Sequence, residues 1–192
     1  MTAERSTLAH GIPEQAAGYA LFTAPTELRC GEMRLVSLVQ VRQSPGPRAT
    51  LSGQLVIGTD WEQCRLIVDL VARGAESRGF DEKTVDAIRI ALEEAIANAV
   101  RHGNRSGDGC IRVDYSFRED SFRVRVTDQG SGFDPNLVPD PTLPENIHKP
   151  TGRGLLLMRH YMTEVRFNDR GNSVEMWKRC RRESGSWSKH GA

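Results

Sequence analysis

Residues 91–103 have the sequence Ala91-Leu-Glu-Glu-Ala-Ile-Ala-Asn-Ala-Val-Arg-His-Gly103. They form the second half of a predicted amphipathic helix over about 82–102, which Asp81 can cap. Glu94 and Asn98 are four residues apart, so both side chains can reach the same small volume beside the helix. There an amide oxygen could hold Mg²⁺, and a carboxylate could take a proton from an attacking hydroxyl. The same pair also occurs on ordinary solvated helix faces, so it does not establish a function by itself.

The apolar stripe of this helix has four members at helical spacing: Ile88, Leu92, Ala95 and Ala99. At roughly 100° per residue, Glu94, Asn98 and His102 form a second stripe that flanks the apolar one. Glu93 points nearly the opposite way, so we expect it to be a solvated surface charge and Glu94 to be the half-buried functional candidate. A histidine at a helix end is often structural, although this one shares the stripe of the proposed site.

The composition is that of an ordinary globular protein and does not by itself indicate a function. Of 192 residues, 38% are hydrophobic, and 26 Lys and Arg against 25 Asp and Glu leave a net charge of +1, which gives no general electrostatic case for nucleic acid or an anionic membrane. No signal pattern or apolar run of membrane length is present, so we expect a soluble, cytoplasmic protein. The four cysteines, Cys30, Cys64, Cys110 and Cys180, lack C-x-x-C spacing, which argues against zinc and favours buried reduced thiols.

We expect one domain over residues 50–180, between an N-terminal extension (1–49) and a polar tail (181–192). The extension is interrupted by prolines and holds a candidate strand at 33–42. It is either poorly ordered or an upstream start that the domain does not need.

Hydrophobic periodicity and capping residues predict the elements of the domain in this order: strand 51–57, helix 61–77 capped by Asp60, helix 82–102, hairpin strands 111–117 and 122–127, a proline-rich loop 135–150, helix 155–162, and hairpin strands 164–168 and 173–179. Such an order is typical of an α+β fold. We expect a two-layer α/β sandwich with the helices on one face of a mixed, mostly antiparallel sheet. A loop as long as 135–150 inside a compact domain is usually functional or disordered.

Two glycine motifs follow the long helix. Asp128-Gln-Gly130-Ser-Gly132 comes after a strand without opening a helix, which excludes the dinucleotide-binding and P-loop arrangements. An aspartate there can instead accept a hydrogen bond from an exocyclic amine such as that of adenine, while the glycines admit a close approach of the backbone. The alternative is an ordinary glycine-rich turn.

The second motif, Gly152-Arg153-Gly154, stands at a helix start. Free backbone N–H groups and the helix dipole make such a start an anion site, and Arg153 could add a contact to a terminal phosphate. Glycines before helices are also common without any ligand.

The three motifs occur in one chain and in order, and together they resemble the GHKL (Bergerat-fold) ATPase superfamily. Glu94-x-x-x-Asn98 resembles its N box, Asp128-x-Gly130-x-Gly132 its G1 box, and Gly152-x-Gly154 its G2 box. Within the superfamily, the chain is most similar to the bacterial anti-sigma factor serine/threonine kinases of the RsbW and SpoIIAB type. The resemblance covers roughly residues 50–180.

This resemblance implies an ATP site between the helices and the sheet, with residues 133–151 as the ATP lid. It implies that Glu94 is the general base, Asn98 the Mg²⁺ ligand and Asp128 the partner of the adenine amine. The remaining nucleotide-binding residues that it implies are His102, Gly130, Gly132, Gly152, Arg153, Gly154, Leu155 and Ser173.

The same resemblance implies an ATP-dependent protein serine/threonine kinase and anti-sigma factor. Such a protein phosphorylates a STAS-type anti-anti-sigma factor, sequesters a sigma factor in transcription regulation, and forms a homodimer. One alternative is a nucleotide-gated partner-binding module without kinase activity. A detached ATPase domain of a histidine kinase is less favoured, because no histidine here lies in a recognisable phosphoacceptor helix.

Overall fold

The computed structural model describes residues 37–43, 50–103, 109–146, 148 and 152–180. The expected tail at 181–192 and most of the expected extension lie outside these residues.

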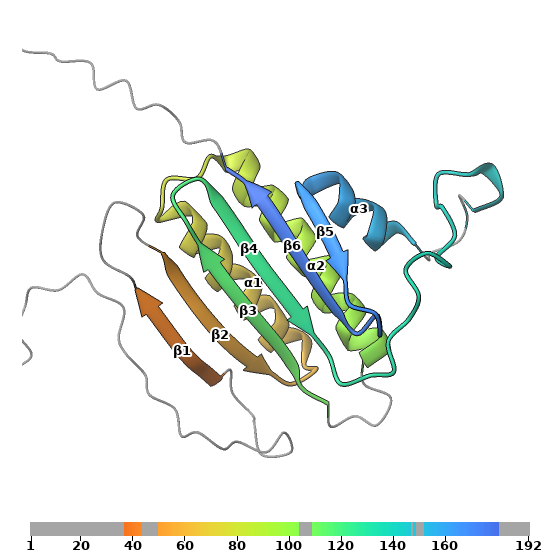
Figure 1. The fold of residues 1–192 in the computed structure, drawn as a ribbon, viewed down its shortest axis with the longest axis horizontal. Coiled ribbons are helices and arrows are strands. Elements are labelled where there is room, and N and C mark those ends of the chain that lie inside the picture. Colours follow the sequence, from red (N-terminus) through yellow and green to blue (C-terminus); the bar gives the residue numbers. More distant parts are fainter. Residues whose placement is uncertain (1–36, 44–49, 104–108, 147, 149–151, 181–192) are drawn as a thin grey trace, which may run out of the picture.

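The described residues form one six-stranded sheet in the order β1-β2-β3-β4-β6-β5 (Figure 1). Its strands are β1 (Ser37–Gln43), β2 (Leu51–Ile57), β3 (Ile111–Phe117), β4 (Ser121–Thr127), β5 (Glu164–Phe167) and β6 (Ser173–Arg179). Every strand pairing in the described sheet is antiparallel, so the mixed sheet expected from the sequence is refined to a purely antiparallel one. Because β1 pairs with β2, the sheet already begins within the segment expected to be an extension.

The helices α1 (Trp61–Glu76), α2 (Glu82–Gly103) and α3 (Arg153–Tyr161) cover one face of the sheet, and a short 3-10 turn, η2 (Pro144–Asn146), lies in the long loop (Figure 1). Asp60 caps α1, because its Oδ1 accepts from the backbone N–H of Glu62 at 2.7 Å. Asp81 Oδ1 accepts from the N–H of Thr84, also at 2.7 Å, at the start of α2. Both predicted caps and the two-layer α+β sandwich are thus confirmed.

The core lies between the sheet and the helices. The predicted apolar stripe of α2 is buried throughout, from Leu92 at 0% to Ala99 at 4% exposure. From the sheet, alternate residues enter the same layer; those that are fully buried include Leu55, Ile57, Val113, Val124 and Met176. The stripe of α2 therefore fixes which face of the sheet the helices cover.

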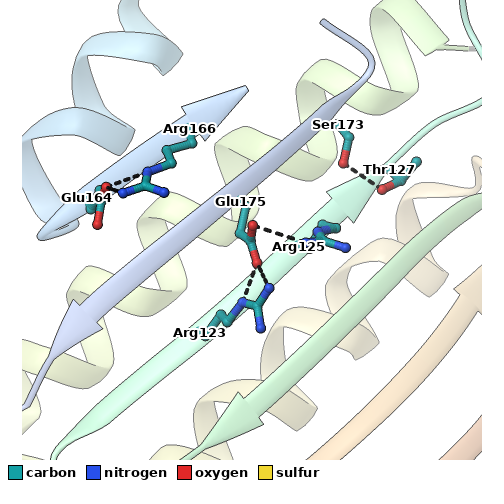
Figure 2. A network of polar contacts seen from close by, with 7 residues as sticks. All are labelled: Arg123, Arg125, Thr127, Glu164, Arg166, Ser173 and Glu175. Carbon is teal, nitrogen blue, oxygen red and sulfur yellow. Dashed lines mark hydrogen bonds and ion pairs between the residues drawn. The ribbon is translucent and has the colours of Figure 1, made fainter. Parts of the chain in front are cut away.

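The opposite, open face of the sheet carries charged side chains. Glu175 on β6 forms ion pairs with Arg123 and Arg125 of β4, the latter at 3.0 Å (Figure 2). The guanidinium groups of Arg123 and Arg166 lie 5.7 and 5.2 Å from the ring centre of Trp177. Such contacts stabilise an exposed face without burying apolar surface.

The cysteines only partly match the expectation of reduced thiols. Cys64 and Cys180 are buried and free, and burial raises the pKa of Cys64 to about 11 and that of Cys180 to about 12. Cys110 is disulfide-bonded, which corrects the expectation for that residue. No helix among the described residues is long and apolar enough to cross a membrane.

Candidate active site

Glu94 and Asn98 lie where α2 meets the first turn of α3. A Cβ added to Gly154 would be 2.5 Å from Glu94 Oε2 and 3.6 Å from Asn98 Nδ2, so any larger residue there would have to displace the Glu94 carboxylate. Glu94 is half-buried, whereas Glu93 is exposed, as the stripe predicted. The first and third sequence motifs therefore meet in space at one point.

Asp128 lies directly after β4, against the C-terminal end of α2. A Cβ on Gly103 would overlap the Asp128 side chain, and a Cβ on Gly130 would lie 2.6 Å from the Cα of Gly103. Asp128 Oδ1 accepts from the N–H of Gly130 at 2.7 Å, and among the described residues Oδ2 has no hydrogen-bond partner. Burial raises the pKa of this carboxyl group. The arrangement leaves one carboxylate oxygen able to accept from a ligand amine.

The loop after Asp128 interlocks with the turn between β5 and β6. Gly132 and Gly171 both have positive φ angles, of 76° and 73°. A Cβ on Gly132 would overlap the carbonyl oxygen of Arg170, and a Cβ on Gly171 would overlap that of Phe133. Each loop thus needs a glycine because the other loop's backbone occupies the space of a side chain.

A cavity of about 20 Å³ lies between α2, the end of β4 and this turn. Its polar lining comprises Asn98, His102, Asp128, Asn172 and Ser173, and its apolar lining includes Ala95, Ala99, Val126, Met158 and Val174. Five of the predicted residues therefore meet here: Asn98, His102, Asp128, Gly132 and Ser173. Such a volume holds about one water molecule and is smaller than a purine.

Aromatic rings border this cavity. The ring of Phe133 lies 6.2 Å from that of His102 and 5.6 Å from that of Phe167, and all three residues line the cavity. His102 is exposed and the two phenylalanines are half-buried, whereas the aliphatic walls belong to the core. Entry of a base therefore requires these rings to move. The polar side chains of the lining fit a base that bears an amine, and the positions of the three rings limit the space for that base.

Ser173 lines the cavity at the start of β6. Its hydroxyl lies 2.7 Å from Thr127 Oγ1, with which it is paired across β4 and β6 (Figure 2). The role beside the base that the resemblance implies for Ser173 stays a prediction. The sequence did not single out Asn172, Phe133 or Phe167. Asn172 could have been found from its place in the last turn, one residue before Ser173.

The described part of the expected lid is an ordered loop. Asp134 Oδ1 accepts from the N–H of Asn136 at 2.8 Å, and Asp140 Oδ1 accepts from the N–H of Thr142 at 2.9 Å. Gly152 has a φ of 88°, and a Cβ there would lie 2.7 Å from the carbonyl oxygen of Pro139. The loop therefore folds back onto the start of α3.

At the start of α3, Arg153 is exposed and Leu155 is buried in the core. Leu155 thus anchors the helix while its backbone remains near the site.

A groove of about 320 Å³ runs between α1 and α2 on the other side of Glu94. It is lined by Trp61, Cys64, Arg65, Val68, Glu93, Glu94, Ile96, Ala97 and Arg101. Trp61 is 52% exposed although it is a large apolar residue. Glu94 therefore borders both this open groove and the Asn98–Gly154 contact.

No cluster of three or more His, Cys, Asp or Glu side chains that could hold a metal occurs among the described residues. An Mg²⁺ ion in nucleotide sites commonly takes one or two protein oxygens and completes its shell with phosphates and water. Asn98 beside the Glu94 carboxylate fits that donor set.

Comparison with known proteins gives consistent matches. Residues 57–178, which include all three motifs, match the family described as histidine kinase-like ATPase domain. The chain is 34% identical over 112 residues to the serine-protein kinase RsbW of Listeria monocytogenes, covering 54% of this chain and 71% of that protein. It is 31% identical over 125 residues to the same-named kinase of Bacillus cereus, covering 61% and 78%. A solved structure of the RsbU and RsbW domains of a Mycobacterium tuberculosis protein matches 68% of this chain and 33% of that one, with 19% identity and a TM-score of 0.47.

Proposed function

Because the chain belongs to the histidine kinase-like ATPase family, and within it to the RsbW type of serine-protein kinase, we propose that it is an ATP-dependent protein serine/threonine kinase. Its substrate is a Ser or Thr hydroxyl of a STAS-type anti-anti-sigma factor. It also sequesters a sigma factor, so phosphorylation of the antagonist sets how much sigma factor is free.

One observation carries this proposal: Glu94 lies between an open groove and the contact of α2 with α3. A kinase base has to meet an incoming protein hydroxyl on one side and the phosphate site on the other. The groove has a volume of about 320 Å³, and Trp61, Arg65 and Arg101 in its lining offer apolar and cationic contacts to a protein segment. A pocket that served only to bind nucleotide would need no carboxylate facing such a groove.

The residues around the site divide the remaining work. Bound ATP·Mg²⁺ supplies the transferable phosphoryl group. Asn98 would hold the metal, Asp128 would accept from the adenine amine, and Gly130 and Gly132 would let the backbone lie close to the base. Gly152, Arg153 and Gly154 would face the phosphates at the start of α3, where helix N–H groups favour anions.

The proposal extends to partners and location. By analogy with its family, the chain acts in the cytoplasm as a homodimer that binds the sigma factor and the antagonist in turn. It needs no direct contact with nucleic acid or a membrane for this role.

The test is phosphate transfer from labelled ATP to a STAS-domain protein encoded beside this chain. We expect Glu94→Gln to lower the transfer rate about 10²- to 10⁴-fold, the usual contribution of a general base. Glu93→Gln is the matched control, because its carboxylate is adjacent but exposed, and it should keep the wild-type rate. Transfer by Glu94→Gln at the wild-type rate would contradict the assignment.

A second candidate function is a nucleotide-gated binding module. The closed state of the 20 Å³ cavity favours it, since ring movement on nucleotide entry could by itself alter a partner surface. Nucleotide that stays bound and uncleaved, with a partner that remains unlabelled, would support this module over the kinase.

A further inference from the structure

The turn between β5 and β6 holds the residue that follows β4. Sheet pairing of β4 with β6 extends to Thr127 and Ser173, so Asp128 is the first residue beyond it. The N–H of Asp128 nevertheless donates to the carbonyl of Asn172 at 3.0 Å, and Asn172 Nδ2 donates to the carbonyl of Asp128 at 2.9 Å. Asn172 therefore binds both backbone groups of Asp128.

A second asparagine fixes the amide of Asn172. Asn168 Nδ2 donates to Asn172 Oδ1 at 2.9 Å, which orients the Asn172 amide with its Nδ2 toward Asp128. Asn168 Oδ1 accepts from the N–H groups of Asn172 and Ser173, each at 3.1 Å. Asn168 thus holds the backbone of the turn, and Asn172 connects the turn to the backbone of Asp128.

The carboxylate of Asp128 depends on this anchorage. One oxygen accepts from the N–H of Gly130, and the direction of the other follows from the backbone of Asp128. Asn172 holds that backbone and also lines the same cavity. A hydrogen bond to a base amine weakens steeply when its angle is wrong, so a small rotation of Asp128 is enough to lose selectivity.

We propose that Asn172 is a positioning residue that orients Asp128 for recognition of the exocyclic amine of the bound base. The inference rests on the proposed use of ATP. It assigns to the β5–β6 turn a part in base selectivity, in addition to its structural role.

Two isosteric variants act at successive steps of these hydrogen bonds. Asn172→Asp keeps the oxygen that accepts from Asn168 but replaces the donor to Asp128 with an acceptor. Asn168→Asp puts the same negative charge in the same turn and keeps the oxygen that accepts from the two N–H groups, but it removes the Nδ2 donor that orients the Asn172 amide. Affinities are measured in the full chain for ATP and for purine riboside triphosphate, which lacks the 6-amino group.

We expect Asn172→Asp to bind ATP about tenfold more weakly, while its affinity for the analogue changes less than twofold. Asn168→Asp should change the ratio of the two affinities in the same direction by a smaller factor, because Asn172 keeps its own donor but loses the group that orients it. In an Asp128→Asn background, Asn172→Asp should leave that ratio unchanged, because the group that it orients is already altered.

An unchanged ratio in Asn172→Asp would overturn the inference, as would a further change of that ratio when Asn172→Asp is added to Asp128→Asn. Either result leaves the proposed function intact if the wild type binds ATP more tightly than the analogue. A wild type that binds neither nucleotide would instead overturn the proposed function, and the inference with it.

Discussion

The two faces of the sheet are built from the same strands but stabilised in different ways. On β6, Met176 is fully buried under the helices, whereas the adjacent Glu175 lies on the open face and pairs with Arg123 and Arg125 (Figures 1 and 2). On the covered face, stability comes from apolar burial. The open face carries ion pairs between partly exposed side chains, and such pairs add little to the stability of the fold in water.

The candidate site belongs to the covered face and lies at its end. Val126 and Val174 are core residues that also line the cavity, and Asp128 follows Val126 by two residues. Polar groups of the site are therefore placed by the same packing that stabilises the fold. From this we expect substitutions on the covered face to affect stability or binding strongly, and those on the open face to affect stability only weakly and binding not at all.

The largest effect should follow from Met176→Ala. Removing a fully buried methionine side chain lowers the free energy of unfolding by about 2–5 kcal/mol, because it loses apolar burial and leaves a cavity. Urea unfolding followed by circular dichroism measures this loss. A decrease below about 1 kcal/mol would mean that β6 does not contribute to the core as described.

The next effect concerns the glycine interlock at the end of the covered face. Gly132→Ala adds a Cβ where φ is 76° and where the carbonyl of Arg170 already lies. The left-handed backbone costs about 1–2 kcal/mol, and the overlap adds about 1–3 kcal/mol. The midpoint temperature of thermal unfolding and the affinity for nucleotide should both fall.

Gly79→Ala is the matched control for that variant. Gly79 has nearly the same φ, 75°, but nothing lies within 4 Å of an added Cβ. Gly79→Ala should be destabilised only by the strained left-handed backbone, and it should keep the wild-type affinity for nucleotide. Equal losses in the two variants would show that the contact with Arg170 is unimportant.

Asp128→Asn should separate binding from stability. Loss of one hydrogen bond from a charged acceptor weakens ATP binding by about 1.5–3 kcal/mol, roughly 10- to 100-fold. Without ligand, the variant should be at least as stable as the wild type at pH 7. Burial raises the pKa of Asp128 above 3.8, an effect that the hydrogen bond from the Gly130 N–H and the charges of His102 and Arg170 only partly offset, so the ionised carboxylate costs folding free energy there.

The stability of Asp128→Asn relative to the wild type should depend on pH in one direction. As the pH falls through the raised pKa toward 3.8, wild-type Asp128 becomes protonated in the folded state, and the stability advantage of the variant should disappear. Thermal unfolding at several pH values measures it. A variant that is less stable than the wild type at neutral pH would contradict the burial argument.

The smallest effect should come from the open face. Glu175→Gln removes the ion pairs with Arg123 and Arg125 but leaves the apolar layer unchanged. We expect a loss of at most about 1 kcal/mol, which becomes smaller in 1 M salt because exposed charges are screened. Phosphate transfer should be unaffected; a loss of transfer would link the open face to function.

Much of the fold could be predicted because its patterns are local. Periodicity and the caps Asp60 and Asp81 gave α1 and α2 to within one residue at either end, since a helix start depends on side chains only two or three positions away. The strands β2 and β3 match their predicted ranges for the same reason. β1 was less clear, because its position depends on pairing with β2 and not on a pattern of its own.

The sequence by itself determined the order of elements, the buried stripe of α2 and the three motifs that carry the family resemblance. Spacing along one helix or one loop is enough for these. Only the tertiary structure decided that Gly154 lies against Glu94, that Asn172 holds Asp128, and that Phe133 borders the cavity. Each of those contacts joins residues from different elements, and their geometry depends on how α2, α3 and the β5–β6 turn pack together. Ser173 shows the difference most clearly: the family resemblance implied that it binds the nucleotide, and only the structure shows that its hydroxyl pairs with Thr127 across β4 and β6 while the residue lines the cavity.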